Sequence, residues 1–320
     1  MKNKILIIFA ILVTLFTTTS CINYAELNEI GIINSMGINK KNDKYIINVN
    51  MLTPNENSIN KSIKYETSGS SITDAFNNLY LTTSKKVNLS HLELLILSKN
   101  LEKEDYINIK DFFLSQKNSR NNFNIIILEN YSESNIFKYN TIDINNLIVT
   151  NSKEMGIVFP KTFDEVIQDI LNINKSYIPT IKIEKEIKIL GYRIVFNDEK
   201  LLSVEESNTF NFLLNKINKC NFTYKNTNIK VESNITRIDI NNNIININIF
   251  STISGETKEY LNGIYINILK DHINKFINNN DLEYFYNLVK KYNKNNKYTK
   301  NNLVFNININ PKTNKVINYE

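Results

Sequence analysis

The sequence predicts an α+β protein with several subdomains, built from mostly antiparallel sheets and packed helices. The first observation is a set of apolar stretches with period-two alternation, paired across short turns rich in Asn and Asp, which is typical of β-hairpins. The second is a smaller set of helical stretches with capping residues, which stand between the hairpins. Helices segregated in this way favour an α+β fold over a doubly wound sheet.

Strands account for most of the predicted elements in the first half of the chain. Residues 31–38 and 45–52 are expected to form a hairpin that turns at Asn42 and Asp43. Further strands are predicted at residues 63–67, 92–97 and 123–128. The last two are almost continuously apolar, which is typical of strands buried on both faces.

Helices in the same half are predicted from their starts. Ser71 with Asp74 and Thr162 with Glu165 have the spacing of capping residues, and each pair precedes an apolar stripe of helical period. Residues 104–114 form a third predicted helix. The polar segment 131–152 shows no clear period, and we assign no element to it. The region around Pro179 is predicted to connect two lobes.

The second half contains the longest predicted elements. A period-two pattern begins at Ile181, and a capped helix with Phe210, Leu213 and Leu214 on one face follows near residue 204. Residues 229–240 and 244–252 predict a hairpin. A single apolar stripe over residues 261–276 predicts a long amphipathic helix that crosses one face of a sheet. A final strand is expected at residues 303–309.

The first twenty residues have the pattern of an export signal. Lys2 and Lys4 precede a 12-residue apolar stretch, Ile5 to Phe16, interrupted only by Thr14. Such a stretch is too short to span a bilayer core of roughly 30 Å as a helix. Small residues follow and lead to Cys21, which is the arrangement of a bacterial lipobox. We therefore predict that residues 1–20 are a lipoprotein signal peptide and that Cys21 is the site of lipid attachment.

The composition excludes several classes of function. The seven glycines never lie within five residues of one another, so the chain has no Gly-rich phosphate loop. The 59 Asn and three Arg residues are what an AT-rich genome produces. The formal net charge is +6, but the lysines are scattered, whereas nucleic-acid binders gather basic residues in a patch. We therefore expect no nucleic-acid partner.

The residue types used in catalysis are scarce. The two histidines, His91 and His272, lie beside an apolar strand and on the long helix, and neither has a nearby nucleophile in the sequence. Cys220 is the second of two cysteines, so a disulfide framework is not expected. Acidic clusters at residues 102–105 and 205–206 lie where helices begin and suit the helix dipole. We predict no enzyme activity, no catalytic residue, no cofactor and no metal site.

Three blocks of sequence, in order, point to a known family. They are CINYAELNEIGIINSMGINKKNDKYIINVNMLTP at residues 21–54, SGSSITDAFNNLYLTTSKKVNLSHLELLILSKNLEKE at 68–104, and LGYRIVFNDEKLLSVEESNTFNFLLNK at 190–216. In this order and behind a lipobox, they resemble the Ger(x)C spore germination lipoproteins, the C subunits of nutrient germinant receptors. The residues that carry the resemblance are Cys21, Glu26, Leu27, Gly37, Ile38, Pro54, Ser68, Gly69, Ala75, Leu79, His91, Leu92, Arg120 and Asp281.

The resemblance implies an organisation and a role. It implies a family N-terminal domain over residues 21–185 and a C-terminal domain over residues 186–320, on an α+β fold. It also implies a lipid-anchored subunit on the outer face of the spore inner membrane, associated with the A-type and B-type integral-membrane receptor subunits. Neither the nutrient nor direct contact between this subunit and a nutrient follows from the resemblance.

Two other classes of lipoprotein remain open at this point. A solute-binding lipoprotein of a transporter also begins with a lipobox, but it is normally built from two lobes of repeated strand–helix units. A lipoprotein enzyme of the cell wall would need candidate catalytic residues, which the sequence does not offer.

Replacement of Cys21 tests the predicted anchor. We expect Cys21→Ala to abolish lipid modification and to move the protein from the membrane fraction to the soluble fraction, because stable anchoring requires more than one acyl chain. Cys220→Ser is the matched control and should remain in the membrane fraction. Retention of Cys21→Ala in the membrane fraction after a high-salt wash would contradict the prediction.

Overall fold

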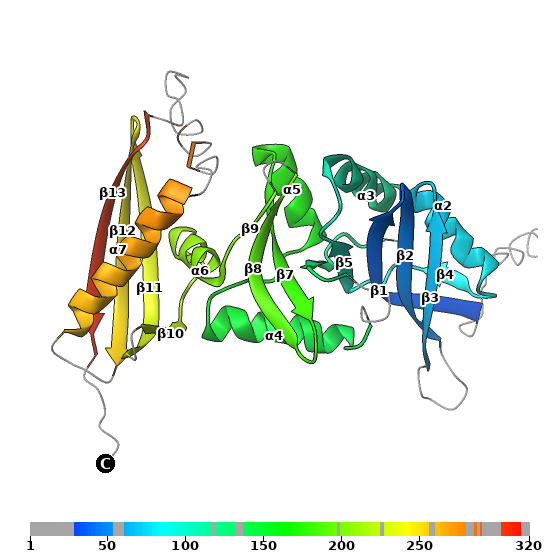
Figure 1. Ribbon diagram of the computed structural model, residues 1–320, viewed down its shortest axis with the longest axis horizontal. Coiled ribbons are helices and arrows are strands. Elements are labelled where there is room, and N and C mark those ends of the chain that lie inside the picture. Colours follow the sequence, from blue (N-terminus) through cyan, green and yellow to red (C-terminus); the bar gives the residue numbers. More distant parts are fainter. Residues whose placement is uncertain are drawn as a thin grey trace, which may run out of the picture.

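The computed structural model describes residues 29–53, 61–116, 119–131, 137–196, 199–224, 227–255, 260–279, 285–286, 289 and 302–314. These residues form a nine-stranded and a four-stranded sheet, which lie side by side along the long axis of the molecule (Figure 1). The fold is α+β, as the sequence predicts. The predicted signal peptide and Cys21 lie outside the described residues.

The first sheet contains β1 (Ile30–Lys41), β2 (Lys44–Thr53), β3 (Lys61–Gly69), β4 (Lys86–Asn88), β5 (Leu94–Ser98), β6 (Asn124–Leu128), β7 (Ser176–Ile183), β8 (Ile187–Val195) and β9 (Lys200–Leu201). Its order is β3-β2-β1-β5-β6-β7-β8-β9, with β4 also paired to β1. The sheet continues past residue 186, because β8 and β9 belong to it. The domain division at residues 185 and 186 stays a prediction.

The centre of this sheet is parallel, whereas the sequence predicted mostly antiparallel sheets. Strands β1, β5, β6 and β7 run parallel to one another, and the antiparallel hairpins lie on either side of them. Strands β5 and β6 are almost continuously apolar, which is typical of parallel strands that are buried on both faces. The sheet is therefore mixed.

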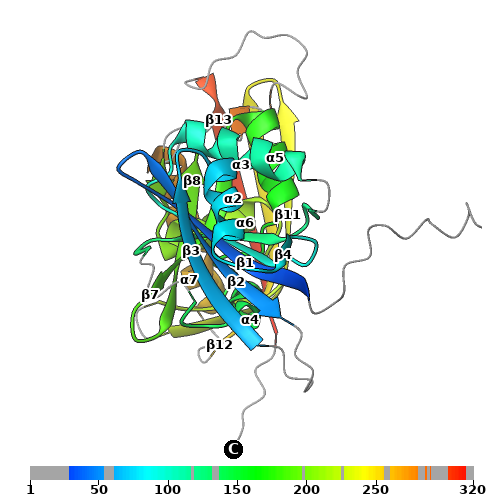
Figure 2. The ribbon, with the colours of Figure 1, turned by 90° about the vertical axis from the view of Figure 1, so that its right-hand side faces the viewer.

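Helices cover both faces of the nine-stranded sheet. Helices α2 (Ile72–Asn77), α3 (Lys103–Ser115) and α5 (Phe163–Ile173) lie on one face, and α4 (Thr141–Glu154) lies on the other (Figure 2). Alternate residues of β5 and β6 divide accordingly: Leu95 and Ile125 belong to the core under α2 and α3, and Leu94 and Ile126 to the core that contains α4. A short 3-10 helix, η2 (Asn78–Leu81), extends α2.

The second sheet contains β10 (Cys220–Tyr224), β11 (Thr227–Asn241), β12 (Ile244–Gly255) and β13 (Val304–Thr313) in that order. The predicted hairpin of β11 and β12 is confirmed. Helix α7 (Leu261–Asn279) crosses one face of the sheet, where its Leu261 and Tyr265 share a core with Ile245 and Ile247 of β12 (Figure 1). The long amphipathic helix is thus also confirmed. The final strand, β13, pairs with β12 in parallel.

Asparagine rows mark the other face of the β12–β13 pair. Asn306 Nδ2 donates to Asn246 Oδ1 at 2.9 Å, and Asn308 Nδ2 donates to Asn248 Oδ1 at 3.0 Å. Each row joins directly opposite residues of the two strands. The isoleucines between them face α7, so the Ile–Asn alternation makes the face toward α7 apolar and the opposite face polar.

Helix α6 (Val204–Leu213) lies between the two sheets. The ring of Phe210 stacks on Tyr177 of β7, with 4.1 Å between centroids, and on Phe276 of α7, with 5.8 Å between centroids. The three rings form a column that runs from the first sheet through α6 to the helix on the second sheet. One continuous core therefore joins the two sheets.

The structure differs from the sequence-based expectation at two segments. Helix α4 occupies most of the polar segment to which no element was assigned; it shows a weak apolar stripe because only Ile144 and Ile148 are buried aliphatic residues. The prediction that the Pro179 region connects two lobes is wrong, since Pro179 lies within β7. Pro179 cannot donate a hydrogen bond, and pairing with β6 begins just after it, at Thr180.

Asp105, at the start of α3, is a fully buried acidic residue on the face of the first sheet that α2, α3 and α5 cover. Its carboxylate accepts hydrogen bonds from Lys40 Nζ at 2.9 Å and Tyr45 OH at 2.5 Å, and it caps α3 through the backbone N–H of Glu102. Burial alone would raise the pKa of Asp105, but these hydrogen bonds outweigh burial and lower it. The group thus ties α3 to the β1–β2 hairpin.

We expect Asp105→Asn to lower the free energy of unfolding by about 3 kcal/mol at neutral pH, because the half-buried Lys40 ammonium and the buried Tyr45 hydroxyl lose their charged acceptor. The folded pKa lies below that of the unfolded chain, so the carboxylate's contribution is complete above the unfolded value of about 3.9 and is lost as pH falls through the folded value. The difference in the free energy of unfolding between wild type and variant should therefore shrink as the pH falls. Urea denaturation at several pH values measures it.

Asp111→Asn is the matched control on the same helix, because Asp111 is exposed and pairs only with Lys110. Its effect should stay within about 0.5 kcal/mol. An equal effect of the two substitutions, or a gap that widens in acid, would contradict the role given to Asp105.

Candidate functional site

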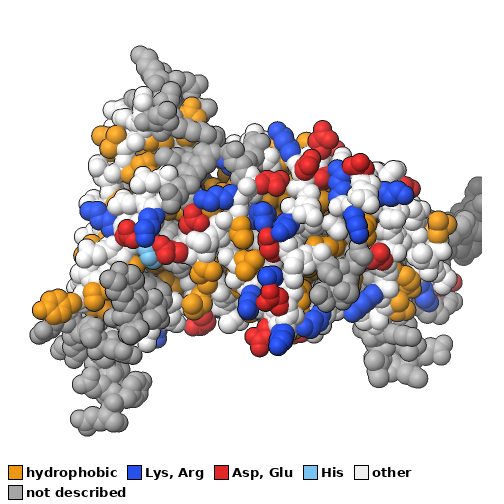
Figure 3. Space-filling model, in the orientation of Figure 1, with side chains coloured by type: hydrophobic (Ala, Val, Ile, Leu, Met, Phe, Trp, Pro, Cys, Tyr) orange, Lys and Arg blue, Asp and Glu red, His pale blue; other side chains and the backbone are white. Residues whose placement is uncertain are grey.

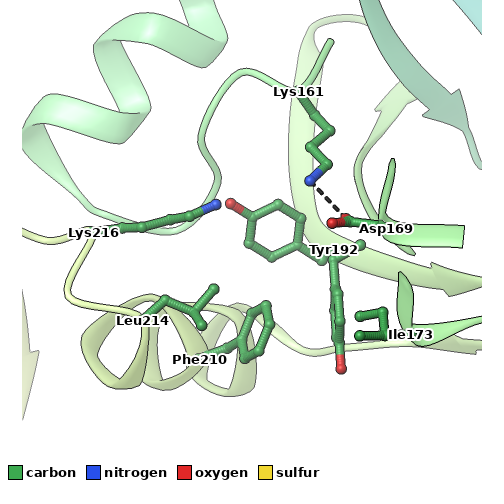
Figure 4. A pocket seen from close by; sticks show the side chains of 8 residues that line it. Lys161, Asp169, Ile173, Tyr192, Phe210, Leu214 and Lys216 are labelled. Atoms are coloured by element: carbon green, nitrogen blue, oxygen red, sulfur yellow. Dashed lines mark ion pairs between the residues drawn. The ribbon is translucent and has the colours of Figure 1, made fainter. Parts of the chain in front are cut away.

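A pocket of about 260 Å³ opens at the junction between the nine-stranded sheet and α6. Its lining comes from five places in the fold: the segment before α5, α5 itself, β7 with β8, α6, and the turn that follows α6. The lining residues are Lys161, Asp169, Ile173, Tyr177, Tyr192, Phe210, Leu214 and Lys216 (Figure 4).

Two lysines and one aspartate give the pocket its charge. Lys161 Nζ lies 2.7 Å from Asp169 Oδ2, and the same carboxylate accepts a hydrogen bond of 2.9 Å from Ser176 Oγ. Lys216 extends from the opposite side, and its ammonium group points toward the pocket (Figure 4). Within the described ranges, Lys216 has no ion-pair partner. The three groups together carry one net positive charge.

The pKa of Lys216 is lowered, first by burial around its ammonium group and then by the nearby charge of Lys161. Asp169 and Glu165 oppose this shift. Glu165 is held at the start of α5, where its carboxylate accepts a hydrogen bond of 2.8 Å from the Thr162 backbone N–H. The position of Lys216 therefore costs free energy for the charged form.

Aromatic rings form the apolar side of the pocket. Tyr177 and Phe210 stack as described above, and Tyr192 is fixed by its hydroxyl, which donates to Asn211 Oδ1 at 3.2 Å and accepts from the Phe159 backbone N–H at 2.8 Å. Burial raises the pKa of Tyr192 to about 12, so it stays protonated at neutral pH. Phe210 is held from outside the pocket by Phe276, and Tyr192 by its two hydrogen bonds.

A second, more polar cleft lies near the N-terminal ends of β5 and β6. It has a volume of about 330 Å³ and is lined by Ser90, His91, Leu92, Glu93, Arg120, Asn122, Phe123, Asn124 and Asn145. The structure thus brings together His91 and Arg120, which carry the family resemblance at separate points of the sequence. The side chain of Asn124 is committed to Asn145, to which it donates at 3.1 Å.

The other residues singled out in the sequence have structural environments. His272 Nε2 lies 3.3 Å from Glu205 Oε1, between α7 and α6, and burial lowers its pKa. Cys220 is buried at the start of β10, and burial raises the pKa of its thiol to about 12. Of the two acidic clusters, Glu102 and Asp105 form the capping box of α3 and Glu206 that of α6.

The surface gathers no single sign of charge on the face shown in Figure 3, where acidic and basic side chains are interspersed. In the part of the chain that the structure describes, no three His, Cys, Asp or Glu side chains come together as a metal site. No helix there is both long enough and apolar enough to cross a membrane.

Comparison with protein families decides the relationship. Residues 23–183 match the model of the spore germination protein N-terminal domain. The chain belongs to this family. The matched region extends from just after Cys21 to the end of β7, and it contains both members of the His91–Arg120 pair.

A solved structure has a similar fold over most of the chain. The crystal structure of the GerBC protein superposes with a TM-score of 0.54 at 17% sequence identity, over 87% of this chain and 96% of that one. At this identity the likeness concerns the fold alone. No curated protein matches the chain.

The buried thiol of Cys220 should react slowly in the native protein. We expect Cys220 in the native protein to react with a maleimide at pH 8 about a hundredfold more slowly than after denaturation, because a buried thiol with a pKa of about 12 is almost wholly protonated. Mass spectrometry of labelled protein measures the rate, and Cys220→Ser supplies the background. Rapid labelling of Cys220 in the native state would contradict this expectation.

Proposed function

We propose that the mature protein is a lipid-anchored subunit of a nutrient germinant receptor, tethered through Cys21 and associated with A-type and B-type integral-membrane subunits. The observation that carries the proposal is the family match over residues 23–183. The lipobox pattern that ends at Cys21 supports the tether, and the family match supports the proposed position of the body on the outer face of the spore inner membrane.

In this proposal the body binds protein partners and performs no chemistry. The family is generally non-catalytic, and the histidines and the second cysteine lie apart from one another in the fold. A tether confines the domain to the membrane surface and so raises its effective concentration near integral partners. Weak polar contacts are then sufficient for association, which suits a surface of mixed charge.

The proposed role predicts a selective germination defect. Spores that lack the protein should lose or blunt the response to at least one nutrient, because the receptor is incomplete, and should germinate normally with a non-nutrient trigger. Loss of optical density in purified spores measures both responses. A normal response to every nutrient in a strain without a paralogue would contradict the proposal.

Complementation and co-purification sharpen the test. The wild-type gene and Cys220→Ser should restore the nutrient response, whereas Cys21→Ala should restore it poorly. The full chain, purified from solubilised spore membranes, should carry multi-spanning receptor subunits with it. Recovery of a transporter permease instead would support the solute-binding alternative.

A further inference from the structure

The pocket beside α6 has the size of a site for a small molecule. Its volume of about 260 Å³ lies just below the range of about 300–1,000 Å³ that is common for drug-sized ligands. The pocket reaches the surface at Lys216, which is an exposed residue. A small molecule can therefore enter without displacement of either sheet.

The charge of the pocket selects the sign of the occupant. Lys161 is already neutralised by Asp169, whose second contact to Ser176 fixes the pair in place. Lys216 has no such partner in the described part of the chain. Lys216 is an exposed residue that lines the pocket, so its charge is available to an anion that enters beside the aromatic rings. One uncompensated positive charge matches a monoanion.

The apolar side selects the shape of the occupant. The rings of Tyr177 and Phe210 form one wall, and Ile173 of α5 and Leu214 after α6 complete the apolar lining. Rigid aromatic walls favour a flat apolar group, because offset and edge contacts between rings add to the burial of area. The charged group and the apolar wall lie on neighbouring sides of one cavity, so a single small molecule can use both.

We propose that this pocket binds a small organic carboxylate that carries a flat apolar group, with its carboxylate at Lys216 and its apolar group against Tyr177 and Phe210. The proposal goes beyond the function in germination and does not rest on it. A failure to bind such an anion leaves the receptor role untouched, and a germination defect alone does not support the pocket.

The test uses the full chain, purified with the membrane fraction or without it, in phosphatidylcholine nanodiscs, titrated with 4-fluorobenzoate and followed by fluorine NMR linewidth. Empty nanodiscs give the blank for partition into lipid. We expect saturable binding of 4-fluorobenzoate and no saturable binding of 4-fluorobenzylamine, which has the same ring and the opposite charge. Equal binding of the two probes would overturn the proposal.

Substitutions at the charged side locate the site. Lys216→Met should weaken 4-fluorobenzoate binding by about tenfold or more, since a hydrogen bond to a charged group is lost. The matched control is Lys219→Met, an exposed lysine three residues further on, which should bind as the wild type does. Lys216→Glu should reverse the preference in favour of 4-fluorobenzylamine. Unchanged affinity in Lys216→Met would refute the assignment.

Two further experiments complete the test: a variant that fills the pocket and titration with a second anion. Leu214→Trp should abolish binding while circular dichroism shows an unchanged fold, because the indole occupies the cavity; undiminished binding in that folded variant would refute the site. Phenyl phosphate distinguishes a phosphate from a carboxylate as the charged group. Tighter binding of phenyl phosphate than of benzoate would overturn the carboxylate assignment.

Discussion

The ring of Phe210 holds the two halves of this molecule in one arrangement. It stacks on Tyr177 of the nine-stranded sheet and on Phe276 of the helix that covers the four-stranded sheet. Each sheet has its own hydrogen-bond ladder, but the core that joins them passes through α6. The packing of Phe210 thus contributes to the relative position of the sheets, and the same ring lines the pocket beside α6.

Local signals predicted much of the fold. The capping residues at Ser71 and Thr162 and the Ile–Asn alternation of β11 and β12 act within a few residues, so they can be read without a partner element. The parallel centre of the first sheet could not be deduced in the same way, because strand direction depends on the connections between distant segments. Pro179 was misassigned because a strand tolerates proline only where a ladder bond is missing, and pairing decides that position.

The pocket could not be predicted from the sequence for a related reason. Its lining is drawn from residues 161 to 216, and Lys161 and Lys216 look like ordinary surface lysines in the chain. Only the fold brings them to one cavity, where Lys161 pairs with Asp169 and Lys216 has no ion-pair partner among the residues that the structure describes. The sequence predicts that Phe210 and Leu214 lie on the apolar face of a helix. The neighbouring residues in the sequence do not indicate that part of this face lines a pocket. His91 and Arg120 met in one cleft through the same long-range pairing of β5 with β6.

The asparagine rows of β12 and β13 leave the alignment of the two strands undetermined in their middle. If β13 slid by two residues, Asn308 would face Asn246 and isoleucine would again face isoleucine, so neither side of the sheet would change its character. The alignment must therefore be fixed at the ends. The backbone N–H of Val304 donates to Asn243 O at one end, and that of Asn314 donates to Ile253 O at the other, both at 2.9 Å. In a strand pair with a two-residue repeat, the register therefore depends on the hydrogen bonds at the two ends and not on the side chains between them.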